Sequence, residues 1–449
     1  MRVAIVGAGP AGSTLAIFLT RLGAEVTLFD DGRHPELLVG ESLVPAVVPI
    51  LQRLGLEAEA AACGPVKPGV SFVWPGAPRF SFTFARFAPA VFPYAYNIAR
   101  PQFDAAMVAR AEAAGVNRVM ARARLQPAPA GAGAELLLAP ETLADAPALG
   151  GRQPDLIVDA TGRARHIARV LDIPAHLGPR KDVAHFAHFQ GFHWDDVPGQ
   201  VLIAPGETGW SWCIPLNDRL SVGIVLGQDD AARLGRTPEE RLHRAIATDA
   251  WLSSVVGAGT RVTGVATYAN YQLISRRGVG PGWVMVGDAF GFVDPMLSPG
   301  VFLALRSAEL VADALAPLVR RQPPASPAAL AAALASYATV QHGMLAAWSD
   351  LIAYFYDGRM VALFRAGRDW MNGGSSTLKT AVQDHIERHI ALQASGAATT
   401  SRYSRGLLRF LSRYALRGID PGPLAIKPRQ GEESTARPRP EAACAQRTR

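Results

Sequence analysis

A glycine turn between two apolar runs at the start of the chain constrains its fold more than any other feature. Residues 3–7, VAIVG, are typical of a buried parallel strand, and GAGPAG then leads into the helical pattern STLAIFLTRLGA. In such a turn Gly7 allows the tight bend, Gly9 lets the backbone approach a pyrophosphate, and Gly12 lets helix and strand pack closely. A second strand, EVTLFDD, reaches Asp30, 23 residues after Gly7, where an acid can bind ribose hydroxyls. The sequence therefore predicts a doubly wound α/β domain that binds a dinucleotide.

Two further apolar runs fit the same parallel sheet. PDLIVDATG at 154–162 runs into a glycine turn, and WVMVG at 283–287 is followed by Asp288. Ligands of open α/β sheets bind at the carboxyl ends of the strands, where Asp288 can accept hydrogen bonds from cofactor hydroxyls. Taken alone, an aspartate at such a place is equally typical of a helix cap. A helix is expected to begin near Gly300.

The region 183–226 has the pattern of antiparallel strands. In one predicted hairpin GWSWCIPL, residues 209–216, turns at an Asn-Asp pair into LSVGIVL. Trp210, Trp212 and Ile214 are spaced by two, so in a strand their side chains share one face. These three side chains form either an ordinary core or a wall beside something reactive.

The remaining segments are expected as a helix at 43–62, short strands within 70–98, a helix at 101–115, and helices from 328 to 417. With 49% hydrophobic residues, the chain of 449 residues is globular and large enough for two or three subdomains. It has no apolar run long enough to span a bilayer and begins with a strand, so we expect neither a transmembrane helix nor a signal peptide, and a cytoplasmic protein.

Cysteine spacing and charge exclude several classes of site. Cys63, Cys213 and Cys444 are scattered, and their spacing predicts neither a disulfide framework nor a metal site. The net charge is +7, but arginines crowd the C-terminal part of the chain. The basic balance therefore does not indicate a nucleic-acid partner.

GAGPAG, DATG at 159–162 and VGDAFGFVDP at 286–295, separated by strand-rich segments, resemble the FAD-binding monooxygenase superfamily over roughly residues 1–330. Within it, four stretches resemble the flavin-dependent halogenases. They are GES at 40–42, GPVKPGVSFVW at 64–74, AYNIARPQFD at 95–104 and WSWCIP at 210–215. The last contains the WxWxIP signature of that family, and the second places Lys67 where the family keeps its catalytic lysine.

The resemblance implies a reaction and a site. In the family, reduced FAD and oxygen give a flavin hydroperoxide, halide attacks it, and hypohalous acid travels to the lysine, which presents halogen to an electron-rich carbon. Because a flavin hydroperoxide oxygenates a substrate it touches, a wall must separate flavin from substrate, and the indoles of Trp210 and Trp212 can supply it. A lysine kept from water has a lowered pKa and is a better nucleophile, which suits Lys67.

The candidate catalytic residues are Lys67, Trp210, Trp212 and Ser298. The candidate cofactor-binding residues are Gly7, Gly9, Ala11, Gly12, Asp30, Glu41, Ser42, Arg100, Asp159, Asp288, Pro295 and Gly300. The expected cofactor is FAD, with chloride or bromide as co-substrate and no metal. Since only one dinucleotide fingerprint is visible, reduced flavin is expected from a separate flavin reductase.

One stretch departs from the family pattern. In tryptophan halogenases a glutamate stands where this chain has Leu297, so an indole substrate is not expected. The family holds halide with two successive backbone N–H groups that match Pro299 and Gly300, and proline has none. A phenol-like ring, free or bound to a carrier protein, fits the missing glutamate. The alternatives are a halogenase-like monooxygenase acting on a polyene or lipid-like substrate, and a non-catalytic flavoprotein partner docked on a membrane.

The implied architecture joins these parts. The expected domains are a discontinuous FAD-binding domain at 1–70, 99–170 and 271–321, an inserted antiparallel β-sheet substrate domain at 71–98 and 171–270, a C-terminal helical cap at 328–417 and a disordered tail at 418–449. In the cap, one face of the segment 401–417 carries arginines and the other apolar residues. The arginines are Arg402, Arg405, Arg409, Arg413 and Arg417, and the apolar residues are Tyr403, Leu407, Phe410, Leu411 and Tyr414. Such a helix lies on an anionic membrane surface or packs on the protein's own body.

Overall fold

The computed structural model describes the whole chain except residues 34, 75–78, 207, 270–271, 373–375 and 427–449. Its first layer is a six-stranded sheet in the order β19-β20-β10-β1-β2-β7, parallel except for the edge strand β19. The strands are β1 (Arg2–Val6), β2 (Glu25–Phe29), β7 (Asn117–Val119), β10 (Leu156–Asp159), β19 (Val279–Gly280) and β20 (Trp283–Met285). The predicted α/β class and its buried parallel strands are confirmed.

Helices pack against this parallel sheet and connect its strands. They include α1 (Pro10–Leu22), α4 (Arg100–Ala113), α6 (His166–Val170) and α10 (Gly300–Leu315). Helix α1 contacts both α10 and α4, because its interior-facing residues from Leu15 to Leu19 are buried. The predicted helix start at Gly300 is confirmed.

The second layer is a larger, mostly antiparallel sheet in the order β16-β12-β15-β14-β13-β4-β5, with β17 paired to β12. Its strands are β4 (Gly69–Phe72), β5 (Phe80–Thr83), β12 (Asp182–Gln190), β13 (Val201–Pro205), β14 (Gly209–Pro215), β15 (Leu220–Gly227), β16 (Thr260–Arg261) and β17 (Ala266–Ala269). Among its described strands only the β4–β13 pair is parallel, and the predicted β14–β15 hairpin is present, with Pro215 opposite Leu220.

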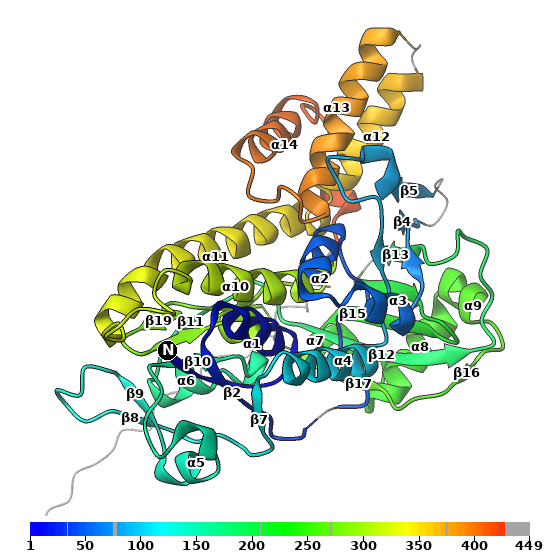
Figure 1. The fold of residues 1–449 in the computed structure, drawn as a ribbon. Coiled ribbons are helices and arrows are strands. Elements are labelled where there is room, and N and C mark those ends of the chain that lie inside the picture. The colour runs from blue at the N-terminus through cyan, green and yellow to red at the C-terminus, as the bar shows by residue number, and fades with distance from the viewer. Residues whose placement is uncertain (34, 75–78, 207, 270–271, 373–375, 427–449) are drawn as a thin grey trace, which may run out of the picture.

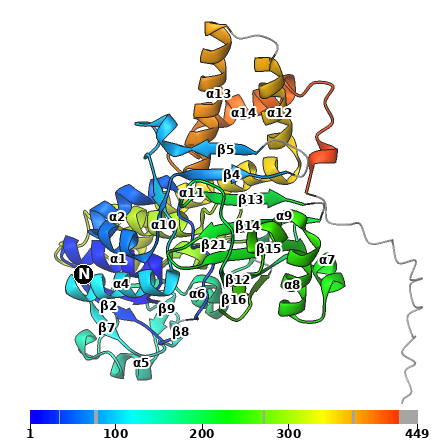
Figure 2. The ribbon, with the colours of Figure 1, turned by 90° about the vertical axis from the view of Figure 1, so that its right-hand side faces the viewer.

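The two faces of this larger sheet belong to different cores. Trp210, Trp212 and Ile203 join the main core on one face. On the other face Leu202 and Cys213 join a smaller core with α7 (Gln228–Leu234), α8 (Pro238–Thr248) and α9 (Ala250–Val256). Successive side chains of a strand point to opposite faces, so the alternation read from the sequence decides which residues meet the first layer. Figure 2 shows β12, β13, β14 and β15 stacked beside the first layer, with α8 and α9 on the outer side.

Three small sheets complete the strands. They are β3 (Val66–Lys67) with β6 (Ala95–Tyr96), β8 (Leu125–Pro127) with β9 (Leu136–Leu138), and β11 (Ala175–Leu177) with β18 (Leu273–Ser275) and β21 (Gly291–Phe292). The short helix α5 (Pro140–Ala144) follows β9.

The C-terminal part is helical, as expected. It contains α11 (Pro327–Tyr356), α12 (Arg359–Asn372), α13 (Thr377–Ala394) and α14 (Arg402–Tyr414). The long helix α11 lies along α10, while α12 and α13 extend away from the body above β4 and β5 (Figures 1 and 2).

Two sequence expectations differ from the structure. The helix expected at 43–62 is divided into a 3-10 turn (Pro45–Val47), α2 (Val48–Leu54) and α3 (Glu57–Cys63), because Gly55 adopts a left-handed conformation, φ 73°, and ends α2. The tail was expected to be disordered from 418, but within it Ile426 is buried and Gly422–Leu424 form a 3-10 turn. The rest of that tail lies outside the described residues.

Candidate active site

A cavity of about 990 Å³ opens at the carboxyl ends of the parallel strands, where open α/β sheets bind their ligands. Most of the residues predicted from the sequence line it. They are Gly7, Gly9, Ala11, Asp30, Glu41, Ser42, Arg100, Trp210, Trp212, Asp288, Pro295, Ser298 and Gly300. Gly12, Asp159 and Lys67 do not line it.

The glycine turn forms a cradle at the N-terminus of α1. A Cβ atom at Gly7, whose φ is 105°, would lie 2.5 Å from the Ala160 carbonyl oxygen, and one at Gly12 would lie 1.9 Å from the Gly7 oxygen. A Cβ at Gly9, the N-cap of α1, would meet nothing within 4 Å. Gly7 and Gly12 are therefore needed for chain packing, whereas Gly9 leaves open the space that a pyrophosphate needs.

The two predicted strand-end carboxylates behave differently. Asp30 faces the cavity and binds Arg118 at 2.7 Å and the Gly32 amide at 3.0 Å. Asp159 is fully buried, and its carboxylate accepts hydrogen bonds from the Thr161 hydroxyl at 2.6 Å and the Ile167 amide at 2.7 Å. Asp159 does not line the cavity, and its oxygens hold the turn that follows β10.

Arg100 and Asp288 lie on the cavity surface. The Arg100 guanidinium forms two 2.9 Å bonds to Asp104 and donates to the Val39 carbonyl at 2.6 Å. Gly40 permits this approach, since a Cβ there would lie 2.8 Å from the Arg100 Nη1 atom. Burial raises the pKa of Asp288 to about 6, although the positive charge of Arg100 opposes the rise. The Asp288 carboxylate is accessible only in part, from the cavity side, where it can bind hydroxyl groups.

Glu41 has a hydrogen-bond partner that the sequence did not indicate. His188, on β12, places its Nε2 atom 2.6 Å from the Glu41 carboxylate, and both side chains are buried. In the sequence alone, a histidine within a strand pattern is typical of a packed core residue. Because 147 positions separate His188 from Glu41, the sequence does not indicate the pair. The buried Ser42 hydroxyl has no hydrogen-bond partner among the described residues, although Ser42 lines the cavity.

Three side chains of strand β14, which we call the wall, border the cavity. Trp210, Trp212 and Ile214 all line the cavity, and the two indole rings lie 5.7 Å apart. The Trp212 indole lies flat against Gly223 of β15, where a Cβ would come within 2.1 Å of the ring. These aligned side chains therefore do more than fill a core, since they form one boundary of the cavity.

Lys67 lies behind the cavity lining. Its side chain is 2% exposed, and its Nζ atom donates to the Leu43 carbonyl at 2.9 Å and lies 5.6 Å from the centre of the Phe84 ring. Burial lowers the pKa of Lys67 to about 7. Glu41 and Ser42 line the cavity, and the next residue, Leu43, holds the lysine, so this short segment separates Lys67 from the cavity.

The turn before α10 has an uncommon backbone. Leu297 and Ser298 have φ angles of 67° and 57°. Residues other than glycine seldom adopt this left-handed backbone conformation. Such strain gathers at functional sites, and both residues line the cavity. Gly300 and Val301 also line it and begin α10, whose first amides have no intrahelical acceptor. The helix terminus therefore supplies anion donors even though Pro299 has no N–H.

The predicted basic helix, α14, packs against the rest of the protein through a narrow face. In α14 Leu408 and Ser404 are buried and Arg405 binds Asp350 at 2.5 Å, whereas Tyr403 and Phe410 are more than half exposed, at 58% and 57%. Of the apolar face expected from the sequence, Leu407 and Leu411 are half-buried, whereas its three aromatic residues are exposed. Among the described residues, no helix combines the length and the apolar character needed to cross a membrane.

The two-layer fold and its cavity at the strand ends have counterparts among known proteins. The chain belongs to the tryptophan halogenase family, whose model matches residues 2–91 and 85–364. A tryptophan 2-halogenase of Chondromyces crocatus is 31% identical over 368 residues, which cover 79% of this chain and 68% of that protein.

Two other relatives widen the comparison. A Pseudomonas fluorescens chlorinase, named for a 1H-pyrrole-2-carbonyl group on a peptidyl-carrier protein, is 28% identical over 347 residues, covering 69% of this chain and 74% of that protein. The solved structure of the myxobacterial chondrochloren halogenase, an FAD-dependent enzyme, superposes with a TM-score of 0.69 at 25% identity, over 88% of this chain and 97% of that one. The chain is therefore an FAD-dependent enzyme of the flavin-dependent halogenase class.

Proposed function

We propose that this enzyme halogenates an electron-rich aromatic substrate, phenol-like and either free or bound to a carrier protein, with hypohalous acid that Lys67 takes up. The observation that carries the proposal is the arrangement around β14. Trp210, Trp212 and Ile214 border the cavity, and a buried lysine with a pKa of about 7 lies behind the segment that includes Glu41 and Ser42.

The cavity residues fit FAD. The open cradle at Gly9 suits the pyrophosphate, Asp30 the ribose, and Asp288 the ribityl hydroxyls, while Arg100 and the N-terminus of α10 supply positive potential near the other end. When FAD is bound and reduced, it would supply, together with oxygen, the oxidising power that converts halide into hypohalous acid. A separate flavin reductase is the proposed source of reduced flavin.

Different residues of the protein would bind the halide, exclude the substrate and transfer the halogen. The amides of Gly300 and Val301 would hold the halide, and the indoles of Trp210 and Trp212 would exclude the organic substrate from the cavity. The neutral Lys67 amine would attack the halogen of hypohalous acid, so that an N–halogen bond forms and water leaves. Halogen then passes to the ring carbon, which loses its proton, and the amine is restored.

The substrate class follows from one residue and one relative. This chain has Leu297 where the tryptophan halogenases have a glutamate, so the proposed ring carries its own activating hydroxyl or nitrogen. The relative named for a carrier-bound pyrrole makes a carrier protein a reasonable partner. A peripheral membrane contact through residues 401–417 also remains a proposal, supported by the exposed Tyr403 and Phe410 beside arginines.

The test is mass spectrometry of phenols and carrier-bound pyrroles incubated with the enzyme, FAD, a flavin reductase, NADH and bromide. We expect brominated product that disappears when bromide is omitted. Pro299 favours one rival, a monooxygenase of the same fold, because it removes an amide at the family's halide site. Oxygenated product of equal yield with and without halide would support that rival and contradict the proposal.

A further inference from the structure

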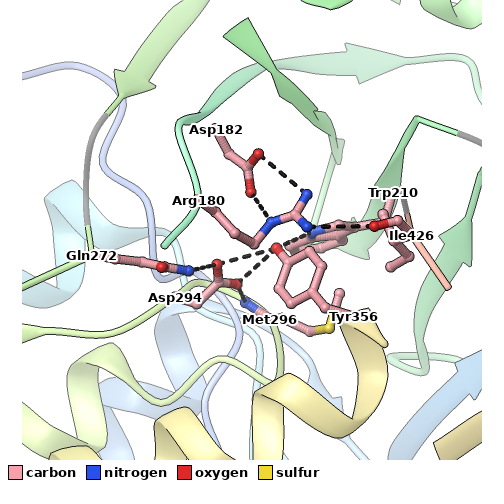
Figure 3. A network of polar contacts seen from close by, with 8 residues as sticks. All are labelled: Arg180, Asp182, Trp210, Gln272, Asp294, Met296, Tyr356 and Ile426. Carbon is pink, nitrogen blue, oxygen red and sulfur yellow. Dashed lines mark hydrogen bonds and ion pairs between the residues drawn. The ribbon is translucent and has the colours of Figure 1, made fainter. Parts of the chain in front are cut away.

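A chain of hydrogen bonds holds the first tryptophan of the wall. The Trp210 indole Nε1 donates to the Tyr356 hydroxyl at 2.9 Å, and that hydroxyl donates to the Asp294 carboxylate at 3.1 Å (Figure 3). Gln272 donates to the same carboxylate at 2.8 Å. We call these four residues the latch. They come from β14, the end of α11, the segment after β21 and the segment before β18.

The carboxylate in the latch is strongly confined. Asp294 is 1% exposed and also accepts a hydrogen bond from the Met296 amide at 2.9 Å. Because Asp294 accepts the Tyr356 proton, the tyrosine oxygen presents a lone pair to the indole, so the direction of the whole chain is fixed. An ionised acceptor also makes the tyrosine bond stronger than a neutral one.

The tyrosine ring and backbone are held as well. The Arg180 guanidinium lies 4.0 Å from the centre of the Tyr356 ring and binds Asp182 at 2.6 Å. The Ile426 amide donates to the Tyr356 carbonyl at 2.9 Å, and the Ile426 carbonyl accepts from Arg180 at 3.4 Å. Ile426 thus secures the end of α11 that carries Tyr356.

The latch lies at the partition between two cavities. Trp210 lines the cavity already described, whereas Tyr356, Asp294 and Gln272 line a second cavity of about 530 Å³. Phe292 lines both. An indole that rotates out of its place would therefore open the first cavity toward the second.

We propose that Tyr356 and Asp294 are positioning residues that fix the Trp210 indole in the wall and so keep the oxidant from escaping into the second cavity. The part about the oxidant rests on the proposed function. The part about the indole does not, and it is tested first, without cofactor.

The first test is 19F NMR of protein in which all eight tryptophans are 5-fluorotryptophan, with the Trp210 signal assigned from Trp210→Phe. Tyr356→Phe removes the hydroxyl that bonds to Trp210 and Asp294 but keeps the ring, so we expect the Trp210 signal to shift or broaden. The matched control is Tyr354→Phe, on the same turn of α11, whose ring packs on Arg359 at 3.8 Å. It should leave the Trp210 signal in place. An unchanged Trp210 signal in Tyr356→Phe would overturn the proposal.

The second test uses pH. Burial raises the pKa of Asp294 to about 6, so the Trp210 signal should titrate with a midpoint near that pH and should not titrate in Asp294→Asn. The titratable and charged side chains described around the latch also include Arg180, Asp182, His176, Asp350 and Asp357. His176→Gln is therefore run in parallel and should keep the titration. A midpoint that survives in Asp294→Asn would contradict the role of that carboxylate.

The third test measures the holoenzyme. In Tyr356→Phe we expect unchanged FAD content, a several-fold larger fraction of oxidant captured by an added scavenger, and less halogenated product, with Tyr354→Phe like the parent. Equal capture in both variants would refute the gating role. If the parent makes no hypohalous acid, the proposed function fails, whereas the NMR result still decides the latch.

Discussion

Among single residues, the proposed reaction depends most on a lysine whose charge the fold suppresses. Lys67 is surrounded by Phe84 and the Leu43 carbonyl, and burial lowers its pKa to about 7. The folded protein therefore binds this proton less tightly than the unfolded chain, in which the amine has a pKa near 10.4. Its contribution to stability is full above the unfolded pKa and is lost as pH falls to about 7.

This difference predicts a pH dependence of stability. Between pH 10 and pH 7 the free energy of unfolding should fall in the parent, by an amount on the order of 4 kcal/mol from this group, and should change less in Lys67→Met. Urea titrations at several pH values measure both curves. Parallel curves would show that Lys67 is charged in the folded protein at neutral pH and is a poor nucleophile.

The glycine turn gives a second prediction at this scale. Gly9→Val should fold with a melting temperature close to the parent, because a Cβ there meets nothing, but should purify without flavin because valine fills the pyrophosphate cradle. Gly12→Ala is the matched control and should lower the melting temperature, because its Cβ would lie 1.9 Å from the Gly7 oxygen. A normal flavin spectrum in Gly9→Val would exclude this placement of the cofactor.

Among the helices and strands, sequence patterns predicted the elements whose formation depends on neighbouring residues. The apolar runs that became β1, β10 and β20, and the hairpin of β14 with β15, were readable because strand periodicity and turn residues are local. The hydrogen-bond partners of Asp159 and Glu41 were not readable, since only the fold brings each pair together. Asp159 binds the turn that begins at Thr161, and Glu41 meets His188 from a distant strand.

Helix α14 illustrates the same limit and carries a third prediction. Its amphipathic pattern was visible, but the pattern did not reveal that Leu408 would be buried and Phe410 exposed. If the exposed aromatic and arginine surface meets anionic lipid, the protein should sediment with anionic vesicles and be released by high salt, and Arg409→Glu with Arg413→Glu should weaken binding. Leu408→Ala should instead cost roughly 2–4 kcal/mol of stability. Equal recovery with neutral and anionic vesicles would leave packing as the helix's only role.

At the scale of the whole molecule, the cavity joins the carboxyl edge of the parallel sheet to one face of the larger sheet. The parallel sheet supplies the cradle and the strand-end acids, and the larger sheet supplies the wall. The second cavity and the latch could not have been read from the sequence, because Trp210, Asp294 and Tyr356 are far apart in the chain. The C-terminal helices matter to the site because α11 brings Tyr356 to the wall.

The central claim is that oxidant made in the cavity is used at Lys67, and the most direct measurement separates those two events. In Lys67→Ala, FAD content and the rate of hypohalous acid formation, followed with a scavenger, should match the parent, while halogenated product should vanish. Lys67→Arg should not restore product, because a guanidinium stays protonated and cannot carry halogen. Halogenated product at the parent rate in Lys67→Ala would contradict the account.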